Sequence, residues 1–123
     1  MKNKKVLLVH EDAFELLRRA VLMEKLGFLP ENIETADSVK VAIQKLDNDA
    51  YFLVITGYMD TGCVNVVEMA LQVKVHNIVI FDVFDTEFAD VYAKCIRQGA
   101  VFISSNEKGS QARFVDEIGK LVK

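Results

Sequence analysis

The chain has 123 residues and a formal net charge of −3, and 51% of its residues are hydrophobic against 27% charged. This length predicts one domain, 1–123, and the composition excludes intrinsic disorder. The negative net charge argues against binding to nucleic acid or to anionic lipid. No apolar run reaches the ~20 residues of a membrane span. The two cysteines lack metal-ligand spacing, which favours a reducing, cytoplasmic location.

Five short segments predict β-strands. In chain order they are Val6–Val9, Asn32–Thr35, Phe52–Ile55, Ile78–Phe81 and Val101–Ile103. All except Asn32–Thr35 are continuous apolar runs rich in β-branched and aromatic residues. Runs that do not alternate with polar residues are typical of parallel strands buried on both faces of a sheet.

Segments with helical periodicity separate these runs. They are Ala13–Leu26, Ser38–Leu46, Gly62–Val73, Thr86–Gln98 and Gln111–Val122. Asp12 is suited to cap the first helix, with Glu15 as its partner in a capping box. Alternating strands and helices predict an α/β fold: a (βα)₅ doubly wound, five-stranded parallel sheet of the flavodoxin-like type.

Ligands of such sheets bind at the carboxyl ends of the strands, so the residues that follow each strand are the candidates for function. The chain contains neither GxGxxG nor GxxxxGK[ST], which removes support for dinucleotide and P-loop binding. It also lacks a G-x-S-x-G elbow, and no cysteine begins a Cys-x₅-Arg loop. These absences remove support for nucleotide binding and for nucleophilic catalysis at the strand ends.

An acidic group remains at the expected rim of the sheet. Glu11, Asp12 and Asp82 follow the first and fourth strands, and carboxylate oxygens suit a hard cation such as Mg²⁺. Alternatively, Glu11 and Asp12 serve only the N-terminus of the following helix, and Asp82 is a loop residue. Two adjacent acids are few ligands for Mg²⁺, so we expect weak binding at most.

The whole chain resembles the receiver domain of bacterial two-component response regulators, a CheY-like fold. KKVLLVHEDAFELLRRAVLMEKLGF resembles that family's first strand, acidic turn and first helix, and YFLVITGYMDTG resembles its third strand and following loop. IVIFDV resembles the fourth strand, and IRQGAVFISSNE resembles the Gly-Ala turn into the fifth.

The resemblance implies six signature positions, most of which differ here. The Mg²⁺-binding acid pair falls on His10 and Glu11, and the phosphoacceptor aspartate falls on Gly57. The remaining signature positions, those of the Ser or Thr, the switch aromatic and the Lys, fall on Asp82, Ile103 and Asn106. A chain without the acceptor carboxylate has no nucleophile there for phosphoryl transfer.

The resemblance therefore implies an atypical receiver, or pseudo-receiver, that signals by protein–protein contact. Such a domain is expected to be no enzyme and to use no organic cofactor. A rival interpretation is a working phosphorelay receiver that uses a displaced acid, Asp60 or Asp82, with Mg²⁺ at Glu11 and Asp12. A third, less favoured interpretation is a small cofactor-binding protein of the flavodoxin type.

Receivers commonly associate through the surface of the fourth helix, fifth strand and fifth helix. Here Phe84 and Phe88 lie at the start of the fourth helix. The charged positions expected to be exposed on the two helices are Glu87, Asp90, Lys94, Arg97, Arg113, Asp116, Glu117 and Lys120. Mixed charges beside apolar groups suit a two-fold homodimer contact, although they equally suit simple solvation of the helices.

Overall fold

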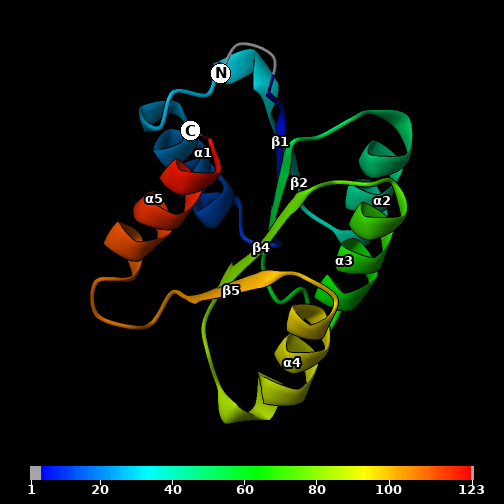
Figure 1. Cartoon of the computed structure of the whole chain (residues 1–123), viewed down its shortest axis with the longest axis vertical. Helices are drawn as coiled ribbons and strands as arrows, with labels where there is room; N and C mark the ends of the chain where they lie inside the picture. The colour runs from blue at the N-terminus through cyan, green and yellow to red at the C-terminus, as the bar shows by residue number, and fades with distance from the viewer. Residues whose placement is uncertain (1–3, 123) are drawn as a thin grey trace.

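The computed structural model describes residues 4–122, which form one parallel five-stranded sheet flanked by helices (Figure 1). The strands are β1 (Val6–Val9), β2 (Ile33–Ala36), β3 (Leu53–Thr56), β4 (Asn77–Asp82) and β5 (Val101–Ser104). Their order in the sheet is β2-β1-β3-β4-β5, and every neighbouring pair is parallel. The predicted (βα)₅ flavodoxin-like architecture is confirmed.

The helices cover both faces of the sheet. On one side lie α1 (Ala13–Lys25) and α5 (Ser110–Leu121), and on the other lie α2 (Val39–Asn48), α3 (Cys63–Gln72) and α4 (Ala89–Arg97) (Figure 1). Two hydrophobic clusters correspond to these two layers. Right-handed crossovers between parallel strands produce this arrangement, and they bring the carboxyl ends of all five strands to one rim.

The central strands show why the apolar runs predicted the sheet. All four residues of β1 and all four of β3 are buried. Alternate residues enter opposite clusters: Leu7 packs towards α2 and α3, whereas Leu8 packs towards α1 and α5. Burial on both faces requires apolar residues at consecutive positions, because side chains of a strand alternate between faces.

Local details differ from the sequence-based expectation at two helix starts. The segment predicted as one helix from Thr86 begins with a 3₁₀ turn, Thr86–Phe88, before α4. Asp12 caps α1 as predicted, and its carboxylate accepts hydrogen bonds from the Phe14 and Glu15 amides. The Glu15 carboxylate, which was expected to complete a capping box, instead forms ion pairs with Arg18 and Arg19.

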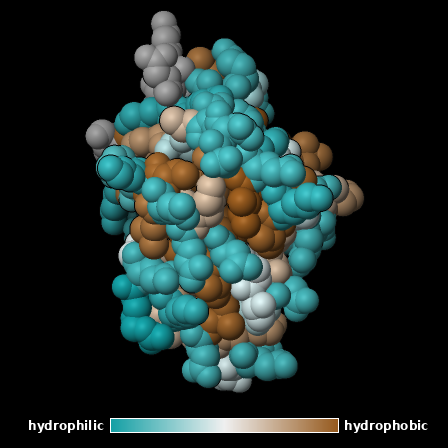
Figure 2. All heavy atoms as spheres, turned by 90° about the vertical axis from the view of Figure 1, so that its right-hand side faces the viewer, coloured by the Kyte–Doolittle hydropathy of each residue, from teal (hydrophilic) through white to brown (hydrophobic). Residues whose placement is uncertain are grey.

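The face that carries α2 and α3 is mainly hydrophilic, with strips of apolar residues between the polar ones (Figure 2). Among residues 4–122, no helix is both long and apolar enough to cross a membrane.

Candidate functional site

Gly57 follows β3 at the centre of the rim, and the space beside its Cα is filled by two neighbouring side chains. A Cβ placed on Gly57 would lie 2.7 Å from the His10 Cδ2 atom and 2.8 Å from an Asp82 carboxylate oxygen. Real Cβ atoms essentially never approach other heavy atoms this closely. The imidazole of His10 and the carboxylate of Asp82 therefore occupy the volume that any side chain at position 57 would need.

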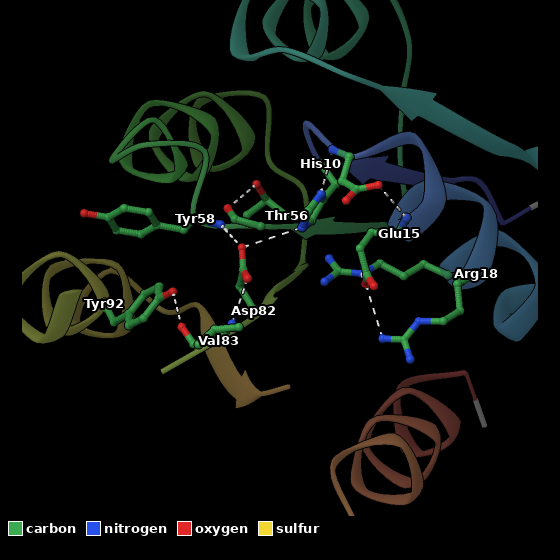
Figure 3. Close-up of polar contacts among 11 residues, drawn as sticks. His10, Glu15, Arg18, Thr56, Tyr58, Asp82, Val83 and Tyr92 are labelled. Atoms are coloured by element: carbon green, nitrogen blue, oxygen red, sulfur yellow. Dashed lines mark hydrogen bonds and ion pairs between the residues drawn. The ribbon is translucent and has the colours of Figure 1, made fainter. Parts of the chain in front are cut away.

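Asp82, at the end of β4, is held in place by backbone amides. Its Oδ2 atom accepts a 2.7 Å hydrogen bond from the Tyr58 amide, and its Oδ1 atom accepts one of the same length from the Val83 amide (Figure 3). The Asp82 backbone carbonyl accepts a 2.9 Å hydrogen bond from the Ser105 amide. Asp82 thus connects the loops that follow β3, β4 and β5.

His10 is only 8% exposed and makes two polar contacts through its ring. Nδ1 accepts a 2.9 Å hydrogen bond from the Asp12 amide, while Nε2 lies 3.7 Å from Asp82 Oδ2 (Figure 3). An accepting Nδ1 requires the neutral ring to carry its proton on Nε2, facing Asp82. Burial, followed by the charge of Arg19, lowers the His10 pKa, although Asp82, Glu15 and Glu11 oppose this shift. The site therefore favours neutral His10.

Asn106 clamps the loop after β5 to the loop after β4. Its side-chain oxygen accepts a 3.1 Å hydrogen bond from the Phe84 amide, and its side-chain nitrogen donates a 3.1 Å hydrogen bond to the Phe84 carbonyl. The Ser104 hydroxyl also donates to the same Asn106 oxygen. Both ends of the amide group are thus occupied by protein atoms at the position where the family resemblance places a lysine.

The loop between β3 and α3 contains three consecutive left-handed residues. Met59, Asp60 and Thr61 have φ angles of 56°, 51° and 72°. Such values are uncommon for residues other than glycine and are unfavourable for a β-branched threonine. The turn buries Met59 in the core and leaves the Asp60 side chain exposed.

The acids expected to hold a cation have separate surroundings. Glu11 is exposed, Asp12 caps α1, and Asp82 binds the amides described above. Within residues 4–122, no three His, Cys, Asp or Glu side chains are grouped as a metal site.

Ile103 and its neighbour Phe102 point to opposite faces of the sheet. Ile103 is fully buried in the cluster beneath α1 and α5. Phe102 stacks on Tyr92 of α4, with 4.3 Å between ring centroids. Tyr92 and Phe102 belong to an aromatic cluster, and its members are Tyr58, Phe84, Phe88, Tyr92 and Phe102. The sequence did not predict that Tyr58 and Phe102 join the aromatic residues of the α4 segment. The aromatic side chain of β5 that contacts α4 is therefore Phe102, next to Ile103, where the family resemblance places an aromatic residue.

The expected interface residues lie on or beside α4 and α5. Phe84 is 42% exposed, whereas Phe88 is partly buried against Tyr58. The predicted charged positions are exposed except for Glu117, which is partly buried: Glu87, Asp90, Lys94, Arg97, Arg113, Asp116 and Lys120. Ile96 and Val101 add exposed apolar groups that the sequence analysis did not assign to this surface.

The structure also reveals a cleft next to this site. It has a volume of about 320 Å³, and its walls include His10, Glu15, Arg18, Arg19, Asp82 and Ser105. Arg19 is the least exposed of its charged residues, at 1%. Helical periodicity gave no signal for Arg19, because arginine is mostly exposed on helices.

Comparisons with known proteins support the fold and nothing finer. No protein-family model and no curated protein matches the chain. Solved structures do match. A two-component response regulator from Clostridium difficile superposes with a TM-score of 0.80 at 14% identity, over 98% of this chain and 96% of that one.

Two further structures agree. A CheY-like response regulator receiver domain protein from Methanospirillum hungatei JF-1 has a TM-score of 0.77 and 15% identity, over 97% of this chain and 94% of its own. Full-length FixJ from B. japonicum has a TM-score of 0.75 and 15% identity over 99% of this chain, which spans only 59% of FixJ. The chain thus has the fold of receiver domains.

Proposed function

We propose that this chain is an atypical receiver-like domain that acts in signal transduction by binding a protein partner, without phosphorylation at the end of β3. The observation that carries the proposal is the filled space at Gly57. His10 and Asp82 lie within 2.7–2.8 Å of where a Cβ would be. This packing supports a rim that has no acceptor carboxylate and no room for one.

The surrounding chemistry supports the same proposal. Phosphoryl transfer to a carboxylate needs cationic or hydrogen-bonding groups that stabilise the developing negative charge. Asp82 instead contributes a negative charge beside Gly57, and the Asn106 amide is used by the Phe84 backbone. These contacts support a structural role for both residues: they join the loops of the rim.

We propose that the partner, a signalling protein or a second copy of the chain, binds the surface of α4, β5 and α5. The exposed Phe84 side chain lies near charges of both signs, which suits a self-complementary contact. We propose no nucleic acid, membrane or organic cofactor for this domain, a cytoplasmic location, and weak Mg²⁺ binding, if any, at Glu11, Asp12 and Asp82.

One observation favours the rival function, a working phosphorelay receiver. Asp60 is exposed in the left-handed turn after β3, close in sequence to Gly57. An accessible carboxylate could accept a phosphoryl group, whereas Asp82 already accepts two amide hydrogen bonds. Asp60 is therefore the displaced acid to test first.

The deciding experiment is incubation with acetyl phosphate and Mg²⁺, followed by intact-protein mass spectrometry. We expect no added phosphoryl group in the wild type, and a receiver domain with an intact acceptor aspartate serves as the positive control. Gly57→Asp should also remain unmodified, because Asp82 and Asn106 are unchanged. Stable phosphorylation mapped to Asp60 or Asp82, and lost in Asp60→Asn or Asp82→Asn, would establish the rival function instead.

Sedimentation velocity at several protein concentrations tests the homodimer arm of the partner proposal. We expect association that does not depend on phosphodonor, and weaker association for Phe84→Ser. Phe14→Ser is a matched control, because Phe14 is 82% exposed on α1, which is not part of the surface of α4, β5 and α5. A monomer at every concentration would reject the homodimer, and a phosphodonor-dependent dimer would reject phosphate-independent signalling.

A further inference from the structure

We propose that the cleft between α1 and the ends of β4 and β5 binds a small organic carboxylate, a monoanion, through the guanidinium groups of Arg19 and Arg18. The cleft shares His10 and Asp82 with the rim around Gly57, but the binding test measures no phosphorylation, so its outcome does not depend on the proposed function.

Arg19 provides the strongest reason to expect a ligand. It is 1% exposed, yet its Nη1 atom has no hydrogen-bond partner among the described residues. Its Nε atom lies 3.3 Å from the Glu15 carboxylate, and its guanidinium carbon lies 4.7 Å from the centre of the Phe81 ring. A buried donor without a partner is unfavourable, and the loss is greater for a charged group. Arg19 is also part of the wall of the cleft, so an oxyanion bound there would remove this cost when the guanidinium group turns towards it.

Further donors line the same cleft. Arg18 has a half-exposed side chain, and its Nη2 atom lies 3.2 Å from the Glu15 carboxylate. Figure 3 shows Glu15 and Arg18 of α1 on one side, and on the other Asp82 at the end of β4 with Val83 directly after it. Ser105, a hydroxyl-bearing residue directly after β5, also lines the cleft. The planar guanidinium groups have parallel N–H donors that match the two oxygens of a carboxylate.

The charge of the walls selects a monoanion. Arg18 and Arg19 are balanced by Glu15 and Asp82, and His10 is favoured in its neutral form. One additional negative charge can be held by the free donor positions. A second negative charge, as in a phosphate dianion, would face the Asp82 and Glu15 carboxylates without compensation. The cleft volume of about 320 Å³ accommodates a small organic acid.

The test is a titration of the protein with sodium acetate, monitored by ¹H–¹⁵N NMR. Sodium chloride at equal ionic strength is the reference. We expect saturable acetate shifts at the amides around Arg19, Val83 and Ser105, with affinity in roughly the millimolar range. Arg19→Met should weaken binding by about ten-fold or more, since it removes charged hydrogen bonds. Arg18→Gln should weaken it several-fold, and the control Lys40→Gln, which removes an exposed cation of α2 on the opposite face of the sheet, should leave it unchanged.

Other outcomes would overturn the proposal. Non-saturable shifts equal to those of chloride would mean that only water fills the cleft. Unchanged acetate affinity in both Arg19→Met and Arg18→Gln would place any binding elsewhere, and tighter binding of inorganic phosphate at pH 8 would refute the charge argument. Arg18→Gln keeps the test valid if Arg19→Met does not fold, because Arg18 is on the surface.

Discussion

Replacing Gly57 by alanine tests whether His10 and Asp82 fill the space beside it. The new methyl group would lie 2.7 Å from His10 Cδ2 and 2.8 Å from Asp82 Oδ2, so both side chains must move. Displacing Asp82 also strains its hydrogen bond from the Tyr58 amide. Overpacking of this kind costs about 1–3 kcal/mol of unfolding free energy. For a chain of this length, that corresponds to a fall of roughly 4–12 °C in Tm.

Thermal and urea unfolding of the wild type and Gly57→Ala measure this cost. Gly119→Ala is the matched control: Gly119 lies within α5 and nothing lies within 4 Å of where a methyl group would be, so alanine should stabilise the helix by about 0.5–1 kcal/mol. In a His10→Ala background the cost of Gly57→Ala should shrink, because one of the two clashing groups is absent. A neutral or stabilising effect of Gly57→Ala in the wild-type background would refute the packing argument.

Three further changes test other parts of the rim. The pKa of His10 is lowered in the folded chain, so below its ordinary value of 6.5 the unfolded state binds a proton more readily than the folded state. The unfolding free energy should therefore be full above pH 6.5 and decrease below it. Urea unfolding between pH 8 and 5 should show a smaller decrease for His10→Gln than for the wild type. Asn106→Ala should lower the unfolding free energy by about 1 kcal/mol and speed hydrogen exchange of the Phe84 amide, because it removes the two hydrogen bonds to the Phe84 backbone. Unchanged exchange at Phe84 would contradict the role of Asn106 in joining the two loops. Thr61 has a φ of 72°, a left-handed conformation that glycine adopts more easily than threonine. Thr61→Gly should therefore raise the unfolding free energy by up to about 1 kcal/mol. A lower unfolding free energy in urea would argue against a strained turn.

The sequence predicted most of the fold because the signals for strands and helix ends are local. The run Val6–Val9 matches β1 residue for residue, and the other strands and helices agree to within about two residues, apart from the 3₁₀ start before α4. Continuous apolar runs can only be satisfied by burial on both faces, so they indicated a parallel sheet directly. The capping role of Asp12 is likewise local.

The rim could not be predicted to the same depth, because its contacts join residues distant in the sequence. The sequence shows that Gly57 has no side chain, but it does not show which neighbouring side chains fill that space. These neighbours are set by the strand register, which places Val9 beside Thr56. Arg18 and Arg19 are adjacent in the sequence, and no local pattern shows that the turn of α1 places Arg19 against Phe81. The local sequence of β5 also did not predict which face of the sheet Phe102 lies on.

The aromatic cluster has a practical consequence for experiments on this chain. The sequence contains no tryptophan and only three tyrosines, so its fluorescence, when excited at wavelengths that phenylalanine does not absorb, comes from tyrosine. Two of these emitters, Tyr58 and Tyr92, lie in edge-to-face contact between the loop after β3 and helix α4. The Tyr92 hydroxyl also donates a hydrogen bond to the Val83 carbonyl, next to the cleft (Figure 3). Ultraviolet emission therefore offers a label-free signal for movement of α4, which can be used to test binding of the proposed partner.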